Sequence, residues 1–200
     1  MTSLRHNQSE QREPRDLYLD AARACILDVG WRRTTLTEVA KRAGVSRMTI
    51  YRAWSDMGSL LGDLMTREWG GVVADSLAEQ DPDAPTVERL VSDIVGTVQR
   101  LRDNELFVRI VELDPELLLP YLLSRRGRSQ EALIEILAAE IESGQRSGAI
   151  REGDAVLMAR SLTLAGHGFV LSAHTMVDDR ASEEALDAEL AVILEAAIRP

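Results

Sequence analysis

The segment TTLTEVAKRAGVSRMTIYRAW, residues 34–54, constrains the fold more strongly than any other part of the chain. Thr35 and Glu38 have the spacing of a capping box, which predicts a helix that begins at Leu36. Gly44 marks the end of that helix, because glycine adopts the left-handed backbone conformation without a clash at Cβ. The first half of the segment therefore predicts a short helix followed by a tight turn.

The second half of the segment predicts another short helix. Ser46 is an N-cap for a helix from Arg47 to about Ala53, in which Ile50 faces inward. Ala40 in the first helix is small enough for the second helix to cross it closely. Two short helices joined in this way form a helix-turn-helix, whose second helix enters the major groove of DNA. The alternative is an αα-hairpin within a helical bundle, since capping boxes and glycines at helix ends are common.

The residues around this segment favour the DNA-binding interpretation. Residues 15–30 form an amphipathic pattern that ends in glycine, and residues 51–61 lead into a long helix. With these neighbours, about the first 70 residues resemble the TetR family of transcriptional regulators. The residues that carry the resemblance are Ala21, Ala22, Gly30, Thr34, Thr35, the run LTEVAKRAGVSRMTIYRAW, Leu60 and Leu61.

The resemblance implies an all-α fold with an N-terminal three-helix head, joined by a long helix to a helical body. We expect a disordered tail over residues 1–13, the helix-turn-helix domain over 14–56, and a ligand-binding and dimerisation domain over 57–200. An N-terminal arm that reaches the minor groove through Arg5 or Arg12 is the alternative to a solvated tail. The family usually carries a lysine that contacts a phosphate at the start of the fourth helix, where this chain has Met57.

The pattern of the remaining chain is helical throughout, and no strand pattern competes with it. The helix that is capped at Asp154 and extends to Met176 is apolar on most faces, so we expect it to be buried on most faces. The other predicted helices run from residue 56 or 58 to about 78, from a cap at Thr86, over 104–113, over 117–123, from a cap at Ser129 to near Gly148, and from a cap at Ser182.

Charge is distributed unevenly along the chain. The net charge is −10, yet residues 1–55 hold ten basic and six acidic residues, a net of +4, and residues 56–200 carry −14. A basic head on an acidic body is typical of a nucleic-acid-binding protein, whereas a uniformly acidic surface does not explain where the positive charge lies. Lys41 is the one lysine among the 23 basic residues, so arginines supply nearly all cationic contacts.

Composition excludes several other classes of protein. We expect no transmembrane span, because no run of about 18 apolar residues is evident, and no secretory signal, because residues 1–15 lack an apolar stretch. The single cysteine, Cys25, cannot form an internal disulfide, which favours a reducing cytoplasm. No nucleophile elbow, phosphate-binding glycine loop or metal-ligand spacing is present, so we expect neither an enzyme nor a cofactor or metal.

Candidate DNA contacts lie in and before the second short helix. Arg47, Met48, Thr49 and Arg52 are expected at base edges, where arginine binds guanine and methyl groups contact thymine. Side chains that suit phosphate contacts, which set the register without reading sequence, are Thr35, Thr37, Lys41, Arg42, Ser46 and Tyr51.

The resemblance places a ligand pocket and a dimer interface in the body. The candidate pocket residues are Met65, Trp69, Leu106, Phe107, Ile110, Tyr121, His167, Phe169 and Leu171, for each of which plain core packing is the alternative. His167 is either a polar anchor in the pocket or a satisfied interface histidine, and a metal site with His174 lacks further ligands nearby. The candidate interface residues in the last two helices are Leu162, Gly166, Leu186, Leu190, Ile193 and Leu194.

Together these features predict a ligand-responsive transcriptional regulator, a repressor, that binds a palindromic operator on double-stranded DNA as a homodimer. A small apolar or amphipathic effector would release it. The alternatives are an activator, or a helical ligand-binding or protein-interaction dimer without specific operator binding.

Overall fold

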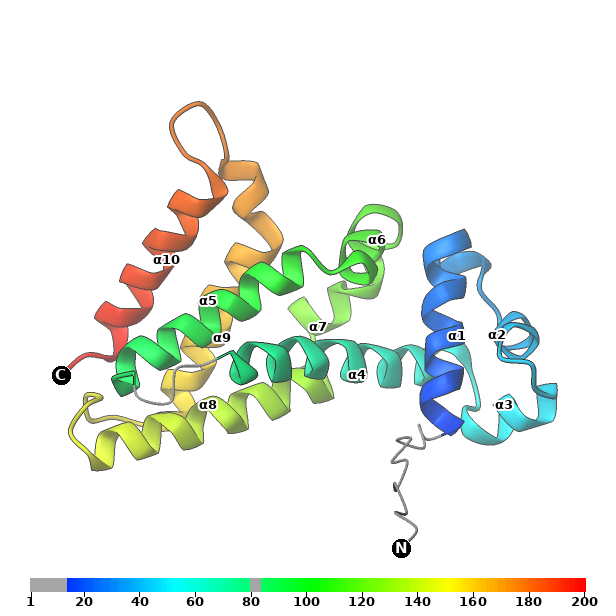
Figure 1. The fold of residues 1–200 in the computed structure, drawn as a ribbon, viewed down its shortest axis with the longest axis horizontal. Coiled ribbons are helices and arrows are strands. Elements are labelled where there is room, and N and C mark those ends of the chain that lie inside the picture. The colour runs from blue at the N-terminus through cyan, green and yellow to red at the C-terminus, as the bar shows by residue number, and fades with distance from the viewer. Residues whose placement is uncertain (1–13, 80–83) are drawn as a thin grey trace, which may run out of the picture. The chain divides into compact units, whose positions relative to one another are not determined.

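The computed structural model describes residues 14–79 and 84–200, and the expected tail over residues 1–13 lies outside this part (Figure 1). The described residues form no β-strand and have a single isolated bridge, between Asp178 and Ala181. The prediction of an all-α fold is therefore confirmed. The helices are α1 (Pro14–Val29), η1 (Trp31–Arg33), α2 (Leu36–Arg42), α3 (Arg47–Ala53), α4 (Met57–Ala78), α5 (Thr86–Arg102), α6 (Glu105–Leu113), η2 (Pro115–Leu117), α7 (Leu119–Leu123), α8 (Arg128–Arg146), α9 (Ala155–Ser172), η3 (Ala173–Met176) and α10 (Glu183–Ile198).

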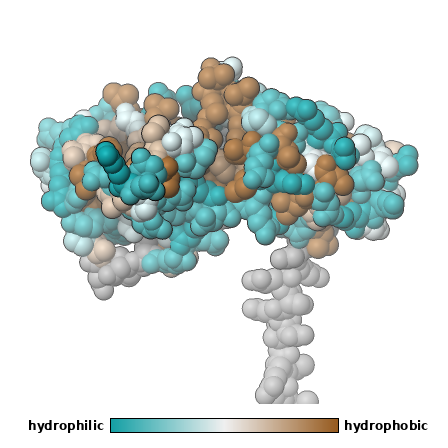
Figure 2. Space-filling view, turned by 90° about the horizontal axis from the view of Figure 1, so that it is seen from above, coloured by the Kyte–Doolittle hydropathy of each residue, from teal (hydrophilic) through white to brown (hydrophobic). Residues whose placement is uncertain are grey.

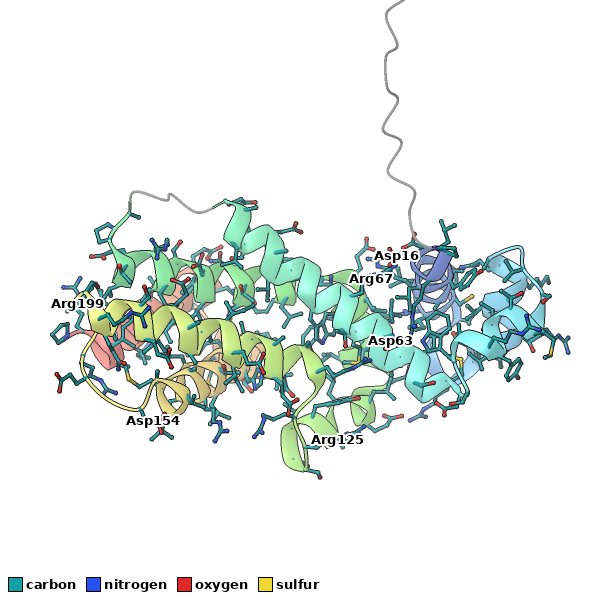
Figure 3. All side chains as sticks on the ribbon, turned by 90° about the horizontal axis from the view of Figure 1, so that it is seen from below. Asp16, Asp63, Arg67, Arg125, Asp154 and Arg199 are labelled. Carbon is teal, nitrogen blue, oxygen red and sulfur yellow. The ribbon has the colours of Figure 1, made fainter. Side chains whose placement is uncertain are left out.

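The chain divides into two compact units, one up to Leu64 and the other from Met65 onward. The boundary lies inside α4, two turns after residue 57, where the sequence placed the start of the second domain. The first two turns of α4 belong to the first unit because Leu60 and Leu64 are fully buried there. Asp63, labelled on α4 beside α1 in Figure 3, also pairs with Arg15 of α1.

The second unit is built around α9, which packs against α8, α5 and α10. Its core takes one apolar face from each helix, and the largest buried members include Ile141 of α8 and both Leu190 and Leu194 of α10. A buried ion pair adds a polar link between α5 and α10, in which Arg102 Nη2 lies 2.6 Å from Asp187 Oδ2. These contacts join segments that are about 85 residues apart in the chain.

Two of the predicted helix caps are wrong by one or two residues. Thr86 is the first residue of α5, whose N-cap is Pro85. Ser129 lies inside α8, which begins at Arg128 after the N-cap Gly127. The side chain of Gln130 accepts a hydrogen bond from Gly127 N at 2.7 Å, so the glycine cap is satisfied by a residue three positions later.

The prediction that α9 is buried on most faces is not met within the single chain, and burial of its remaining face by a second copy stays a prediction. The α-helix ends at Ser172 and continues to Met176 only as 3₁₀ turns. Leu157 is 61% exposed and Leu164 is 70% exposed, so one apolar face of α9 has no partner within the described chain. Figure 2 shows apolar side chains at the surface in several places among hydrophilic ones.

By length and composition alone, the segment Ala155–Met176 passes as a membrane span, contrary to the expectation that no such segment exists. The packing gives another reason for its apolar character. Ala159 and Leu162 are buried against the other helices of the second unit, as in the core helix of a folded domain.

Candidate nucleic-acid interface and ligand cavity

The turn between α2 and α3 has the local geometry that the sequence predicted. Thr35 Oγ1 accepts a hydrogen bond from Glu38 N at 3.2 Å, which caps α2. Gly44 has φ of +67°, and Val45 N donates to Ala40 O at 3.0 Å across the helix end. Ser46 Oγ accepts from Thr49 N at 3.2 Å and so caps α3. The helix-turn-helix is thus defined by contacts within a few residues of each cap.

Helix α3 buries one side chain and presents the others. Ile50 is fully buried, whereas Arg47, Met48, Tyr51 and Arg52 are exposed. Within the described part of the chain, neither Arg47 nor Arg52 takes part in an ion pair, so both guanidinium groups are free to bind an anion or a base edge. The exposed face of α3 is therefore chemically suited to DNA.

The candidate phosphate contacts are all accessible, but several are already engaged. Thr35 and Ser46 act as helix caps, and the hydroxyl groups of Ser46 and Thr49 lie 2.9 Å apart. Arg42 pairs with Asp28 of α1, which raises the pKa of its guanidinium further above the usual value. Lys41 is exposed and has no ion pair among the described residues, and Thr37 is half-buried.

The start of α4 carries an ionised carboxylate next to Met57. Asp56 caps the helix, because its carboxylate accepts a hydrogen bond from Ser59 N at 2.7 Å. Hydrogen bonds from the backbone and hydroxyl of Ser59 and from Ser55 lower the pKa of this carboxyl, so it stays ionised. A fixed negative charge thus stands next to Met57, where a DNA phosphate would be repelled.

A polar cluster that sequence reasoning missed supports the end of α3. Trp54 is 3% exposed, and its indole Nε1 donates a hydrogen bond to Asp63 Oδ2 at 2.8 Å. Asp63 also pairs with Arg15, whose guanidinium lies 5.1 Å from the centre of the Trp54 ring. Tyr18 packs edge-on against the same ring at 6.3 Å. No local spacing signals this cluster, since its members come from two helices and the residue after α3.

The second unit contains a cavity of about 260 Å³ that lies between α4, α5, α8 and α9. Its walls are mostly apolar. The lining residues are Thr66, Trp69, Gly70, Val72, Val73 and Leu77 from α4, Leu90, Asp93, Ile94, Thr97, Val98 and Leu101 from α5, Ser129, Gln130, Ala132, Leu133, Ile136, Leu137 and Glu140 from α8, and Leu162, Thr163, Gly166, His167 and Val170 from α9.

Of the candidate pocket residues, Trp69 and His167 line this cavity and the others do not. Phe107 stands behind the wall, because its ring packs edge-on against Trp69 with the ring centres 5.7 Å apart. Tyr121 instead carries Arg125 over its ring at 5.0 Å. Residues buried in core packing are Met65, Leu106 and Ile110, and Phe169 and Leu171 are half-buried.

His167 is held in a defined environment at the cavity wall. Its Nε2 lies 3.4 Å from Gln130 Nε2, and Gln130 is a cavity residue that sequence reasoning missed. Burial lowers the pKa of the imidazole, because the charged form loses its hydration. The sequence does contain a signal for Gln130, because a glutamine three residues after the N-cap Gly127 has the spacing of a capping box.

Most of the candidate interface residues lie inside the chain's own core. Leu162, Leu190 and Leu194 are at most 3% exposed, and Gly166 packs α9 against Val98 of α5. These four residues have no surface left for a partner, and two of them line the cavity. Leu186 is half-buried, and Ile193 is 50% exposed. Most of the predicted interface residues therefore face the core of the second unit. The exposed apolar residues of α9 and α10, such as Leu164 and Val192, lie on the other side of each helix.

A capped helix-turn-helix with free arginines, followed by a helical unit with an apolar cavity, defines the class of DNA-binding transcriptional regulators. Residues 19–64 match the family of bacterial regulatory proteins called the tetR family. An uncharacterized HTH-type transcriptional regulator of Mycobacterium tuberculosis (strain H37Rv) is 40% identical over 172 residues, which are 86% of this chain and 87% of that protein. The chain belongs to the tetR family, and it is a regulator, not an enzyme.

Solved structures share the fold along nearly the whole chain. The fatty acid degradation regulator FadR from Bacillus halodurans aligns with a TM-score of 0.65 at 19% identity, covering 93% of this chain and 96% of that one. The SmeT–triclosan complex aligns with a TM-score of 0.62 at 22% identity, covering 94% and 93%. At these identities the likeness concerns the fold alone.

Proposed function

We propose that this regulator is a repressor that binds a palindromic operator as a homodimer and leaves it when a small effector fills the cavity of the second unit. One observation carries the proposal. Helix α4 is continuous from Met57 to Ala78, its first turns belong to the DNA-binding unit, and its later turns supply Trp69 and other walls of the cavity. A ligand that moves α4 therefore acts on the helix that carries the head.

The operator would be read by α3. Arg47 and Arg52 have free guanidinium groups, each able to bind guanine through two hydrogen bonds, and Met48 can contact a thymine methyl group. Lys41 is the best phosphate contact of the turn, since Arg42 is already paired with Asp28. The DNA target and the free, buried thiol of Cys25 support a cytoplasmic location.

Dimerisation would use the exposed apolar face of α9 and α10. On α9, Leu157 and Leu164 are exposed two turns apart, and Gly168 continues the same row with a small residue. On α10, Val192 is 57% exposed and Ile193 is 50% exposed. Such a face on two packed helices suits a two-fold interface, and a two-fold dimer presents two copies of α3 to a palindrome.

The effector would act by binding one arrangement of the heads more tightly than the other. A ligand with equal affinity for the DNA-bound and free arrangements does not shift the equilibrium between them, so the shape of the cavity must differ between the two arrangements. SmeT, which shares the fold, forms a complex with triclosan. The apolar walls of the cavity in this chain support a small, largely apolar effector.

The test is selection of bound sequences from a random pool of DNA duplexes. The wild type is compared with an Arg47→Ala/Arg52→Ala variant and with an Arg146→Ala/Arg180→Ala variant, which removes the same charge from exposed positions outside the helix-turn-helix. We expect the wild type and the second variant to enrich one palindrome, with affinity that falls steeply as salt rises. The first variant should enrich nothing.

Enrichment of an asymmetric sequence would contradict the dimer. If the wild type enriches nothing even at low salt, operator binding fails, and a ligand-binding or protein-interaction dimer becomes the better interpretation. The carboxylate of Asp56 beside Met57 is the observation that favours this second function, because it places negative charge where the family contacts a phosphate.

A further inference from the structure

The polar groups of the cavity specify the chemical class of ligand more narrowly than its apolar walls do. Among the described residues that line the cavity, none is a lysine or an arginine, whereas two are carboxylic acids, Asp93 and Glu140. Glu140 pairs at 3.2 Å with Arg89, which is not part of the lining, and Asp93 also has a partner, so neither carboxylate is free to hold a cation of the ligand. A carboxylate or phosphate on the ligand would thus be buried without a cation, at a large cost in free energy.

The hydrogen bonds of Gln130 settle the orientation of its amide group. Gly127 N can only donate, so the atom that faces it at 2.7 Å must be the amide oxygen Oε1. The amide nitrogen Nε2 therefore points toward His167 Nε2 at 3.4 Å. Because Nε2 of glutamine can only donate, the histidine nitrogen that faces it must accept.

This arrangement defines the tautomer of His167. With Nε2 as an acceptor, a neutral imidazole carries its proton on Nδ1. Burial of the ring also favours the neutral form, since it lowers the pKa. Within the described residues no group accepts a hydrogen bond from Nδ1, and this nitrogen is not among the buried polar atoms that lack a partner, so its N–H group is accessible to water or to a ligand.

We propose that the ligand of this cavity is an uncharged, largely apolar molecule with one hydrogen-bond acceptor, a carbonyl or ether oxygen, which binds the Nδ1–H group of His167. This inference rests on the proposed function, in which the cavity is the effector site, and it names the class of effector. The other walls, which include the Trp69 ring, supply apolar contact, and Gln130 holds the imidazole in place.

The experiment uses four naphthalene derivatives that differ in one group. 1-Acetylnaphthalene carries a carbonyl oxygen, 1-ethylnaphthalene has a methylene group in its place, 1-naphthoate is an anion and 1-naphthylmethylammonium is a cation. Binding to the full-length protein is measured by isothermal titration calorimetry. We expect the ketone to bind about two- to tenfold more tightly than the hydrocarbon, the range given by one net hydrogen bond. Both ions should bind more weakly than the hydrocarbon.

Three variants locate the effect. His167→Phe keeps an aromatic ring but removes the donor, so it should abolish the preference for ketone over hydrocarbon while both still bind. His174→Phe, at an exposed position that does not line the cavity, should keep the preference. Leu133→Trp fills the cavity and should weaken the binding of all probes. Circular dichroism checks that each variant is folded.

The outcomes separate the two proposals. If the ketone and hydrocarbon bind equally, or if naphthoate binds most tightly, the ligand class is wrong, although the cavity remains a ligand site. If His167→Phe still prefers the ketone over the hydrocarbon, His167 is not the group that donates the hydrogen bond to the ligand. If no probe binds, or if Leu133→Trp changes nothing, both the ligand class and the effector role of the cavity are contradicted, whereas operator selection stands on its own test.

Discussion

His167 shows how one residue links the second unit's packing to its chemistry. The imidazole is largely buried at the cavity wall and is oriented by Gln130, whose own amide is fixed by Gly127 N. Desolvation holds the pKa of His167 below its ordinary value of about 6.5. The folded state therefore binds a proton at this site less readily than the unfolded chain does.

This difference predicts how stability depends on pH. Because the unfolded state takes up more protons as the pH falls below about 6.5, the free energy of unfolding decreases in that range. Asp93 and Glu140 line the same cavity and also carry ionisable groups. The contribution of His167 is therefore obtained by comparing the pH dependence of stability in the wild type with that in a variant without the imidazole. We expect the wild type to lose more stability between about pH 7.5 and about pH 5 than His167→Phe, in urea unfolding followed by circular dichroism.

The His174→Phe variant is the control for this measurement, since His174 is exposed. It should follow the wild type over the whole range. Equal pH profiles for the wild type and His167→Phe would show that burial of the imidazole has no energetic consequence, and the neutral form of His167 would lose that support.

At the scale of the elements, glycines at helix ends and inside helices have opposite roles. Gly44 has φ of +67° and open space where a Cβ would stand, so alanine there costs only backbone energy. Gly71 lies inside α4, exposed and with the same open space around it. We expect Gly44→Ala to reduce the free energy of unfolding by about 1–2 kcal/mol and Gly71→Ala to raise it by about 0.5–1 kcal/mol.

Chemical unfolding of the two alanine variants measures both effects with the same substitution. A neutral Gly44→Ala would mean that the turn between α2 and α3 has room to relax into another conformation. A destabilising Gly71→Ala would mean that this part of α4 needs the freedom of glycine, for example to bend when a ligand binds.

A buried ion pair joins α5 and α10 in the second unit. Asp187 Oδ2 accepts from Arg102 Nη2 at 2.6 Å and from Gln99 Nε2 at 2.9 Å. Within the described chain, Arg102 Nε and Nη1 and Asp187 Oδ1 have no hydrogen-bond partner. The pair is therefore only partly satisfied, and its desolvation cost is large.

We expect Asp187→Ala to lower the free energy of unfolding by about 3–5 kcal/mol, because it leaves the guanidinium buried without its partner. The double variant Arg102→Met/Asp187→Leu removes both charges and should be more stable than the single variant. A double-mutant cycle from urea unfolding measures this coupling. Additive losses would show that the two side chains act independently.

At the scale of the whole molecule, the exposed apolar side chains of α9 and α10 predict association. Leu164 is 70% exposed in the single chain, which is unusual for a leucine on a helix that is otherwise in a core. We expect the wild type to be a dimer and Leu164→Arg to be a monomer of unchanged helical content, by sedimentation or light scattering. Loss of the dimer should also weaken operator binding.

Leu123→Arg is the matched control, since Leu123 is 78% exposed but lies on α7. It should remain dimeric. A dimeric Leu164→Arg with a monomeric Leu123→Arg would place the interface on α7 and would contradict the proposed face.

The local parts of this fold could be predicted from the sequence because they depend on neighbours a few residues apart. Thr35 and Ser46 cap helices through amides three positions later, and Gly44 is needed for one positive φ. The separation of a basic head from an acidic body was equally visible, since charge needs no structure to be counted. The family followed from the same short segment.

The tertiary structure alone decided which faces of the apolar helices are buried. In α9 and α10 apolar residues occupy most positions, so periodicity does not distinguish Leu162, which is buried, from Leu164, which is exposed. The cavity depends on four helices, and the Arg102–Asp187 pair joins residues far apart in the chain. Such contacts arise from how helices pack against one another, and no spacing within a single helix encodes them.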